Sequence, residues 1–334
     1  MKLLILNVRI GVETGKNIST ELGIAQGDCL SPILFIFYLA LSLKPLPEFN
    51  IKEDYKENIF WSELDWLVKK DEHEIEVDIQ YADDITFIRS QYSKINKIKR
   101  PIPEMLEENN LLLNNDKTEE HRIGKEGEDE SWKKCKFLGS IINTEEDIRR
   151  RKGITIGVYK QLDHIFKSRK IGNELKIRSF KTYICSVFLY NSELWTLTKK
   201  LEEDIDIFQR KQLRKILGIY WPKKISNENL YDRTKVEPWS RTIRRRRLKW
   251  FGHMMRLQTE TPAQKALQQY IKSVSKPVGR PKQTWIYNLY TDIKEHSDLI
   301  NVNFKNEQTF INNMYEICRD RAKWNKTIEY MMLQ

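Results

Sequence analysis

Cysteine is scarce in this 334-residue chain, and its cysteines stand far apart, at Cys29, Cys135, Cys185 and Cys318. A disulfide framework needs more and closer cysteines, so we expect reduced thiols. No cysteine has a second cysteine or a histidine at the spacing typical of zinc-binding motifs. The sequence therefore predicts neither a disulfide-stabilised fold nor a structural zinc site.

Long apolar runs are missing as well. The longest, residues 33–43, is shorter than the ~18–20 residues that a membrane-spanning helix needs. The first residues, MKLLILNVRI, hold an apolar run too short for a signal peptide. These absences predict an intracellular protein, in the nucleus or the cytoplasm, with no membrane partner.

Apolar residues are nevertheless plentiful, since 40% of the chain is hydrophobic and 11% is aromatic. A disordered chain would have far fewer. A domain usually takes ~100–200 residues, so the length predicts two or three domains with cores of their own.

The net charge of +11 is unevenly distributed. Residues 1–150 carry a balance of −8, residues 151–282 a balance of +20, and residues 283–334 a balance of −1. A middle stretch this basic, with tryptophans between the charges, favours a surface that binds nucleic-acid phosphates. The alternative is a solvated helical surface that is rich in lysine.

The most clearly helical stretch is 198–218. Thr198 suits the N-cap, acidic residues crowd the first turns, basic residues the last, and Gly218 follows. This order complements the helix dipole at both ends. A second helix is predicted to begin at Ser31, because serine is a good N-cap and Pro32 fits the first helical position.

Residues 75–88, IEVDIQYADDITFI, alternate as strands do on both sides of Ala82-Asp83-Asp84. The pattern predicts a hairpin with an acidic tip. Adjacent carboxylates repel each other unless a cation is present, and their hard oxygens suit Mg²⁺. The alternative is an ordinary turn, where aspartate is favoured because it hydrogen-bonds to the backbone.

The sequence around this hairpin favours the metal-binding interpretation over an ordinary turn. GIAQGDCLSPILFIFYLAL, QYADDITFI, LLLNNDKTE and CKFLGSIIN follow one another within residues 20–142, and in this order they resemble the motifs of reverse transcriptases. The later blocks FLYNSELWTLTKKLEEDIDIFQRKQLRKILGI, RTIRRRRLKWFGHMMRL and GRPKQTW resemble the thumb and downstream region of LINE-type (non-LTR) retrotransposon enzymes that also carry an endonuclease. Nothing in the chain resembles that endonuclease.

The resemblance implies an RNA-directed DNA polymerase that uses Mg²⁺, an RNA template, a DNA primer or target, and deoxynucleoside triphosphates. It implies that Asp83 and Asp84 are metal ligands in two-metal catalysis and that Lys117, near the pyrophosphate, is a proton donor. The residues that it places at the template and incoming nucleotide are Gln26, Gly27 and Tyr81. Those that it places in the primer-grip hairpin are Phe137, Leu138 and Gly139.

One departure from the family pattern concerns a third metal-binding aspartate, which the family carries on an apolar strand upstream of the QGD block. Only 25 residues precede Gln26, and their acids, Glu13 and Glu21, do not lie in apolar strands. The fingers that hold the triphosphate are missing too. We therefore expect a carboxy-terminal part of such an enzyme, inactive as this chain alone. The alternative is a non-catalytic nucleic-acid-binding remnant of a decayed retroelement.

The basic stretch contains a run of four arginines, at Arg244, Arg245, Arg246 and Arg247. Successive helical residues point around most of the helix, so we expect some of them to bind phosphate and others to pair with acids. A nuclear-localisation patch and a plain solvated surface are the alternatives.

Arg280 stands in GRPK, which resembles a hook that reads the DNA minor groove, although the short motif favours the alternative of a proline-stiffened linker. Three tryptophans could stack on bases or belong to the core: Trp195, Trp221 and Trp250.

The fold that we expect is α+β. Its predicted parts are a partial reverse-transcriptase palm with an antiparallel sheet and helices over residues 1–145, and a helical thumb over 146–222. A basic helical nucleic-acid-binding region over 223–271, a linker over 272–283 and a helical segment over 284–334 follow.

Overall fold

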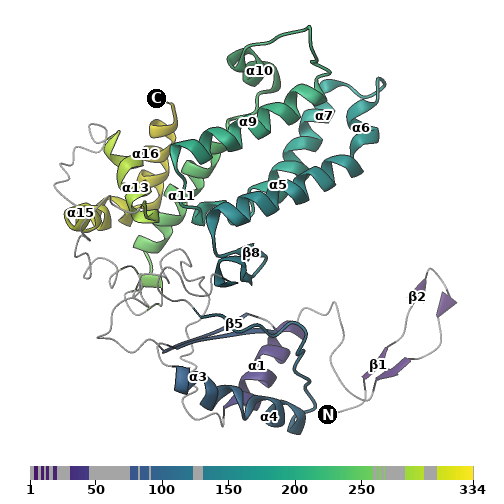
Figure 1. The fold of residues 1–334 in the computed structure, drawn as a ribbon, viewed down its shortest axis with the longest axis vertical. Helices are drawn as coiled ribbons and strands as arrows, with labels where there is room; N and C mark the ends of the chain where they lie inside the picture. Colours follow the sequence, from purple (N-terminus) through teal and green to yellow (C-terminus); the bar gives the residue numbers. More distant parts are fainter. Residues whose placement is uncertain are drawn as a thin grey trace. The chain divides into compact units, whose positions relative to one another are not determined.

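The computed structural model describes residues 4–6, 9–10, 13–14, 18–20, 31–44, 76–81, 83–89, 92–122, 131–258, 261, 263–264, 267, 283–296 and 307–333. The chain divides into two compact units (Figure 1). The amino-terminal unit comprises Met1–Tyr55 and Glu72–Thr118, and the carboxy-terminal unit comprises Lys56–Asp71 and Glu119–Gln334. No helix in the described ranges is long and apolar enough to cross a membrane.

The amino-terminal unit is built around one antiparallel hairpin, β5 (Glu76–Tyr81) and β6 (Asp84–Arg89). Three helices accompany it, namely α1 (Ser31–Leu43), α3 (Tyr92–Lys99) and α4 (Ile102–Glu108). Short strands pair upstream, β1 (Leu4–Leu6) with β4 (Ile18–Thr20) and β2 (Arg9–Ile10) with β3 (Glu13–Thr14). The helix predicted to begin at Ser31 is confirmed.

The core of this unit lies on one face of β6. Ile85 and Phe87 are two residues apart, so their side chains leave the strand on the same side. Both pack against the buried residues of the three helices, which are Leu39, Leu43, Ile98 and Leu106. Asp84 alternates with them and therefore leaves the strand on the other side, away from the core.

The carboxy-terminal unit is mostly helical. It begins with a short hairpin of β7 (Lys136–Phe137) and β8 (Ser140–Ile141). The helices that follow are α5 (Thr144–Gln161), α6 (Asp163–Lys167), α7 (Asn173–Ser179), α8 (Cys185–Phe188), α9 (Lys199–Ile216), α10 (Asn227–Thr234), α11 (Trp239–Met255), α13 (Trp285–Lys294), α15 (Glu307–Arg319) and α16 (Arg321–Leu333). A π-helical turn, Phe180–Ile184, joins α7 to α8.

Helix α9 confirms the helix predicted over 198–218. The Thr198 side chain accepts a hydrogen bond from the Leu201 backbone N–H at 3.2 Å, as an N-cap does. Ile205 and Leu213 lie in the core, at the spacing of one helix face. Gly218 ends the helical region with φ of +65°, which glycine adopts without strain.

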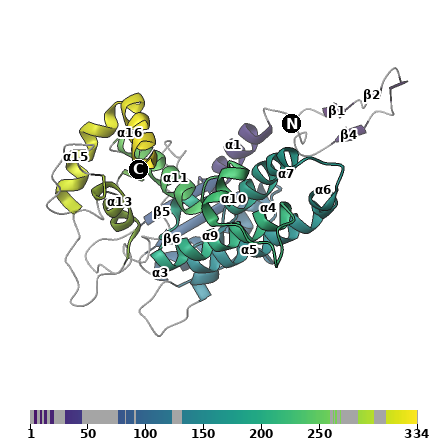
Figure 2. The same cartoon turned by 90° about the horizontal axis from the view of Figure 1, so that it is seen from above.

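Two hydrophobic clusters stabilise this unit, and α11 contributes to both. Its first half brings Trp239 against Phe188, with ring centroids 4.1 Å apart, in the cluster of α5 to α9. Its second half brings Phe251 against Phe310, 5.8 Å apart, in the cluster of α13, α15 and α16. These last three helices gather beside α11 in both views (Figures 1 and 2). One long helix thus ties the two halves of the unit together.

The mostly helical structure with small antiparallel sheets agrees with the predicted α+β class. The palm and thumb assignments stay predictions. The two units meet in sequence at residues 118–119, upstream of the palm end predicted at 145, because hairpin β7–β8 is hydrogen-bonded to α5 and belongs to the second unit. The predicted linker lies almost wholly outside the described residues.

Candidate active site and candidate nucleic-acid surface

The acidic tip of hairpin β5–β6 is confirmed. Tyr81 pairs with Asp84, which leaves residues 82–83 as a two-residue loop. Asp83 lies in this loop and Asp84 begins β6, and both side chains are exposed. Tyr81, also exposed, lies across the ladder from Asp84. The core contacts of Ile85 and Phe87 hold the strand, so the carboxylates are presented on a fixed support.

These carboxylates fit Mg²⁺ in kind but are too few for a complete site. Both offer hard oxygen ligands, and a cation would relieve their mutual repulsion. In the described part of the chain, no third histidine, cysteine, aspartate or glutamate joins Asp83 and Asp84 in a group able to hold a metal. The hairpin therefore offers two carboxylates that suit Mg²⁺, and their role as metal ligands stays a prediction.

Lys117 lies in the same unit, in an exposed turn of residues 115–117. Its backbone N–H donates to the Asn114 side-chain oxygen at 3.2 Å, and the Thr118 hydroxyl donates to the Asn114 carbonyl at 2.8 Å. The turn is thus fixed while the ammonium group faces solvent. Its role as a proton donor stays a prediction, and Gln26 and Gly27 lie outside the described residues.

The residues predicted as a primer grip form the turn of hairpin β7–β8. Leu138 and Gly139 have φ of +44° and +81°, the left-handed pair that a tight two-residue turn requires. The Tyr190 hydroxyl donates to the Leu138 carbonyl at 2.9 Å, and the Arg150 guanidinium donates to the Gly139 carbonyl at 3.0 Å. Side chains from α5 and from the α8 end therefore hold the turn rigidly.

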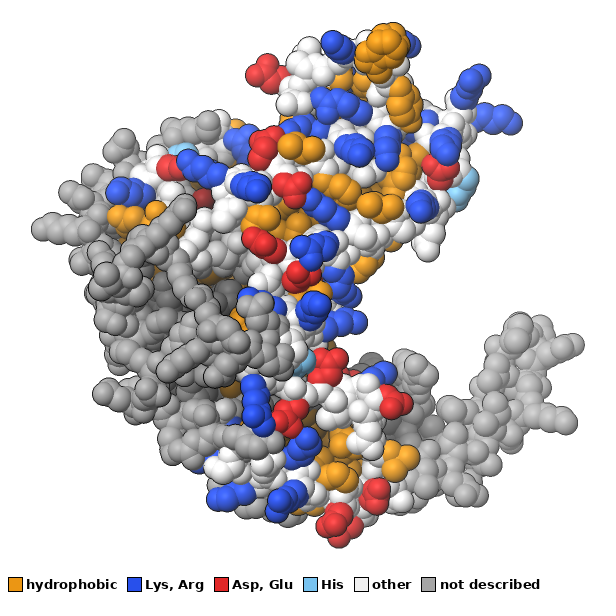
Figure 3. All heavy atoms as spheres, viewed as in Figure 1, with side chains coloured by type: hydrophobic (Ala, Val, Ile, Leu, Met, Phe, Trp, Pro, Cys, Tyr) orange, Lys and Arg blue, Asp and Glu red, His pale blue; other side chains and the backbone are white. Residues whose placement is uncertain are grey.

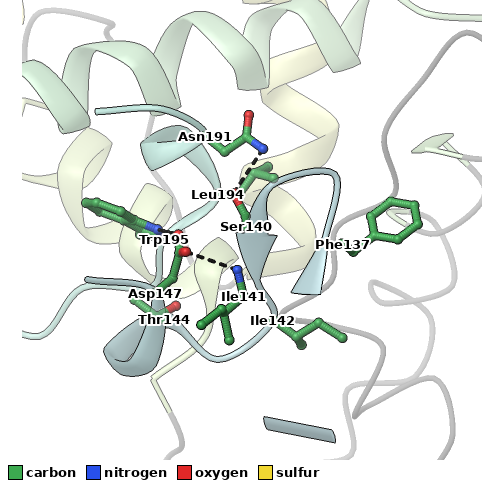
Figure 4. Close-up of a pocket in the computed structure, with 9 residues that line it drawn as sticks. All are labelled: Phe137, Ser140, Ile141, Ile142, Thr144, Asp147, Asn191, Leu194 and Trp195. Atoms are coloured by element: carbon green, nitrogen blue, oxygen red, sulfur yellow. Dashed lines mark hydrogen bonds between the residues drawn. The ribbon is translucent and has the colours of Figure 1, made fainter. Parts of the chain in front are cut away.

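Asp147 is the buried centre of this arrangement. One of its carboxylate oxygens accepts the Ile141 backbone N–H and the other accepts the Trp195 indole N–H, both at 3.0 Å (Figure 4). The cavity beside it measures about 30 Å³, the room of roughly one water molecule. It is therefore too small for a nucleotide and is part of a rigid joint. In Figure 4 the Phe137 ring points away from Asp147 and Trp195.

Comparison with known families bears on this part of the chain. Residues 1–142 match the family model described as reverse transcriptase (RNA-dependent DNA polymerase). The match supports a reverse transcriptase. The matched segment, residues 1–142, contains Asp83, Asp84, Lys117 and the β7–β8 turn. Reverse transcriptases use Mg²⁺, nucleic-acid templates and deoxynucleoside triphosphates. No curated protein and no solved structure matched the chain.

Downstream of the matched segment, residues 1–142, three of the four arginines in the run form ion pairs. Arg247 is 1% exposed and donates to Asp292 at 2.9 Å. Arg244 lies 3.1 Å from the same carboxylate. Burial lowers the pKa of Arg247 and raises the pKa of Asp292, so the pair forms against a desolvation cost.

The other two arginines differ in exposure. Arg245 donates to Glu237 at 2.9 Å and lies 3.4 Å from Glu329. Arg246 is exposed and donates to the Leu189 carbonyl. Nucleic-acid contact by the arginine run stays a prediction. Arg246 is the residue best placed for it, because it is exposed and the other three arginines pair with carboxylates. Arg280 lies outside the described residues.

The structure also shows a basic groove that the sequence reasoning missed. Helices α5, α6 and α9 enclose about 540 Å³, and Figure 3 shows basic side chains over them with apolar ones between. We call this the lysine groove. Its basic side chains are Lys152, Lys160, Lys167, Lys211 and Lys215.

Charge and aromatic surface occur together in the lysine groove. Lys152 lies 2.5 Å from Asp204, and Lys167 lies 2.6 Å from Asp163. None of the acidic side chains that the structure describes pairs with the other three lysines. The aromatic lining is Tyr159, Phe166, Phe208 and Tyr220.

The aromatic residues differ in what they can offer a base. Tyr159 and Phe166 stack on each other with centroids 4.8 Å apart. Tyr220 is 60% exposed and the neighbouring Trp221 is 84% exposed. Of the tryptophans considered for stacking, Trp195 is buried in the core, as the core alternative predicted, whereas the Trp221 side chain is exposed.

Proposed function

We propose that the chain is part of an RNA-directed DNA polymerase of a LINE-type retrotransposon. The observation that carries the proposal is the adjacent pair Asp83 and Asp84, exposed at the tip of a hairpin inside the segment that matches reverse transcriptases. The motif order and the later blocks of the sequence support the LINE-type assignment.

In this proposal each residue has a limited task. Asp83 and Asp84 would hold Mg²⁺, which supplies charge stabilisation and an activated nucleophile in two-metal transfer. Lys117 would deliver a proton to the departing pyrophosphate. Tyr81, with Gln26 and Gly27, would contact the nascent base pair.

The primer would be positioned by a turn that cannot shift easily. The β7–β8 turn is held through its carbonyls by Tyr190 and Arg150, and Phe137 points away from the buried joint. A misplacement of ~1 Å between reacting groups can cost ~100-fold in rate, so a rigid turn suits this task.

Catalysis by this chain alone is not expected. Two-metal transfer needs ligands on opposite sides of the ions, and Asp83 and Asp84 approach from one hairpin tip. Mg²⁺ tolerates poor coordination geometry badly. Since no third metal-binding side chain joins the pair in the described ranges, a further carboxylate has to complete the site.

A second candidate function is non-catalytic binding of nucleic acid. The lysine groove favours it, because three lysines that no described carboxylate neutralises lie together with an exposed tyrosine and do not depend on a metal. Phosphates would meet the lysines and unpaired bases would stack on aromatic faces. In the first candidate the same groove would hold template or primer.

One experiment separates the two candidates. A chimera would carry, ahead of this chain, the strand with the upstream aspartate and the fingers of a full-length LINE-type relative. We expect it to extend a DNA primer on an RNA template with Mg²⁺ and to lose this activity in Asp83→Asn and Asp84→Asn. A chimera that binds template and primer but makes no DNA favours the non-catalytic candidate.

A further inference from the structure

A second group of metal-ligand side chains lies in the carboxy-terminal unit, apart from the aspartate pair. Glu119, His121 and Cys135 each offer one ligand atom, and these atoms lie within 4.8 Å of one another. No zinc-motif spacing connects them in sequence, so the spacing rule that argued against a structural zinc site does not cover this group. The fold brings them together across 14 residues, from His121 to Cys135.

The backbone and hydrogen bonds hold the three residues near each other. Cys135 stands directly before β7, where its N–H donates to the Trp132 carbonyl at 3.1 Å and its carbonyl accepts from the Ile142 N–H at 3.2 Å. The His121 Nε2 lies 2.8 Å from a Glu119 carboxylate oxygen. The cluster is therefore attached to the predicted primer-grip hairpin.

An imidazole nitrogen without a partner points to a ligand. The Nδ1 atom of His121 is buried and makes no hydrogen bond. With Nε2–H donated to Glu119, Nδ1 carries a lone pair. A buried polar atom that lacks a partner is costly and rare in folded proteins. The Cys135 thiol next to it is free as well.

We propose that Glu119, His121 and Cys135 form a three-ligand site for a zinc-class transition metal ion. A thiolate, an imidazole and a carboxylate are the donors that Zn²⁺ takes, whereas Mg²⁺ takes oxygen ligands only. Metal–ligand bonds of ~2.0–2.3 Å place tetrahedral ligand atoms roughly 3.3–3.8 Å apart. The cluster has to contract by about 1 Å, and the exposed Glu119 side chain would exchange its hydrogen bond to His121 for a bond to the ion.

Metal binding would change both the charge and the mobility of this region. The thiol has to lose its proton to become a ligand, and burial together with the Glu119 charge raises its pKa to about 11 without a metal. The bound ion would join residues 119–121 to the base of hairpin β7–β8. Three protein ligands leave the fourth coordination position to water.

The test is protection of Cys135 in the full-length chain. The alkylation rate of each cysteine by iodoacetamide is measured by peptide mass spectrometry with Zn²⁺, with Mg²⁺ and with neither ion. A chromogenic chelator competition gives the zinc stoichiometry and affinity. We expect one Zn²⁺ per chain, at least ~10-fold slower labelling of Cys135 with Zn²⁺ alone, and no change at the buried Cys318.

Variants assign the ligands. His121→Asn and Cys135→Ser should each weaken zinc binding by about 100-fold or more, and Glu119→Gln by about 10-fold. His164→Asn, which changes an exposed histidine on α6, is the matched control. Circular dichroism without metal verifies that each variant folds, and Glu119→Gln carries the test if another variant does not.

Two results would overturn the site: equal zinc affinity in Cys135→Ser and the unchanged chain, or labelling of Cys135 that Zn²⁺ does not slow. Either result leaves the polymerase proposal intact, because neither readout involves nucleic acid. Conversely, a failure of the chimera to make DNA leaves zinc binding unaffected.

Discussion

Three lysines of the lysine groove give the sharpest test of nucleic-acid binding. Lys160, Lys211 and Lys215 have no carboxylate partner among the described residues, so their charges are available to phosphate. Each phosphate neutralised on a single strand contributes about −0.7 to the slope of log affinity against log salt. If these three lysines each meet one phosphate, they contribute about −2.1 to the slope.

The triple change Lys160→Ala, Lys211→Ala and Lys215→Ala should remove this contribution from the slope. Between roughly 50 and 200 mM salt, the three lysines account for an about 18-fold fall in the affinity of the unchanged chain, which the variant should no longer show. The assay is fluorescence anisotropy of labelled single-stranded RNA and DNA over this salt range.

A second triple variant controls for total charge. Lys199→Ala, Lys323→Ala and Lys326→Ala remove the same charge from exposed positions outside the groove lining. We expect their slope to stay near that of the unchanged chain. Equal slopes in the two triple variants would refute the groove and leave only a diffuse basic surface.

Three further predictions concern stability and the metal. Arg247→Met should lower the free energy of unfolding in urea by about 3 kcal/mol, because the buried Asp292 carboxylate loses one of its two arginine partners. The double variant Arg247→Met with Asp292→Leu should recover most of this stability. A double variant as unstable as Arg247→Met would contradict the desolvation argument. Gly139→Ala should lower the free energy of unfolding by about 1–2 kcal/mol, because φ at this position is +81°. Gly153→Ala, at an open position in a helix, should raise it by up to ~1 kcal/mol. A change of the same sign in both variants would contradict the left-handed turn at Gly139. Zinc affinity should rise about tenfold per pH unit between roughly pH 7 and 9, because the Cys135 thiol, with a pKa of about 11, has to lose its proton to bind. Chelator competition at each pH measures the affinity. An affinity that does not change with pH would exclude the thiolate as a ligand.

Local patterns in the sequence predicted what depends on neighbouring residues. Helix α9 has its cap, charge order and terminal glycine within one stretch, and all three occur as expected. Hairpin β5–β6 follows from strand alternation around Asp83 and Asp84. The positive φ at Leu138 had no such signal, because leucine does not favour that conformation.

Features made by distant residues could not be predicted in this way. Arg247 pairs with Asp292, which is 45 residues away in sequence. This pairing allows Arg247 to be buried although it belongs to a basic run. His121 and Cys135 are 14 residues apart, and the fold brings their side chains together. The lysine groove combines residues of three helices, and no periodicity within one helix shows that their lysines converge. A faint signal was present in Lys211 and Lys215, which are four residues apart and share a face of α9.

The measurement that tests the central claim most directly is primer extension on an RNA template with Mg²⁺ or Mn²⁺. It compares the unchanged chain and the chimera with the upstream aspartate strand and fingers, each with and without Asp83→Ala. The account predicts DNA product from the chimera alone, because the added strand supplies a third carboxylate, which does not accompany Asp83 and Asp84 among the described residues. Robust synthesis by the unchanged chain, abolished by Asp83→Ala, would contradict it and mean that another acid of this chain, such as Glu13 or Glu21, completes the metal site.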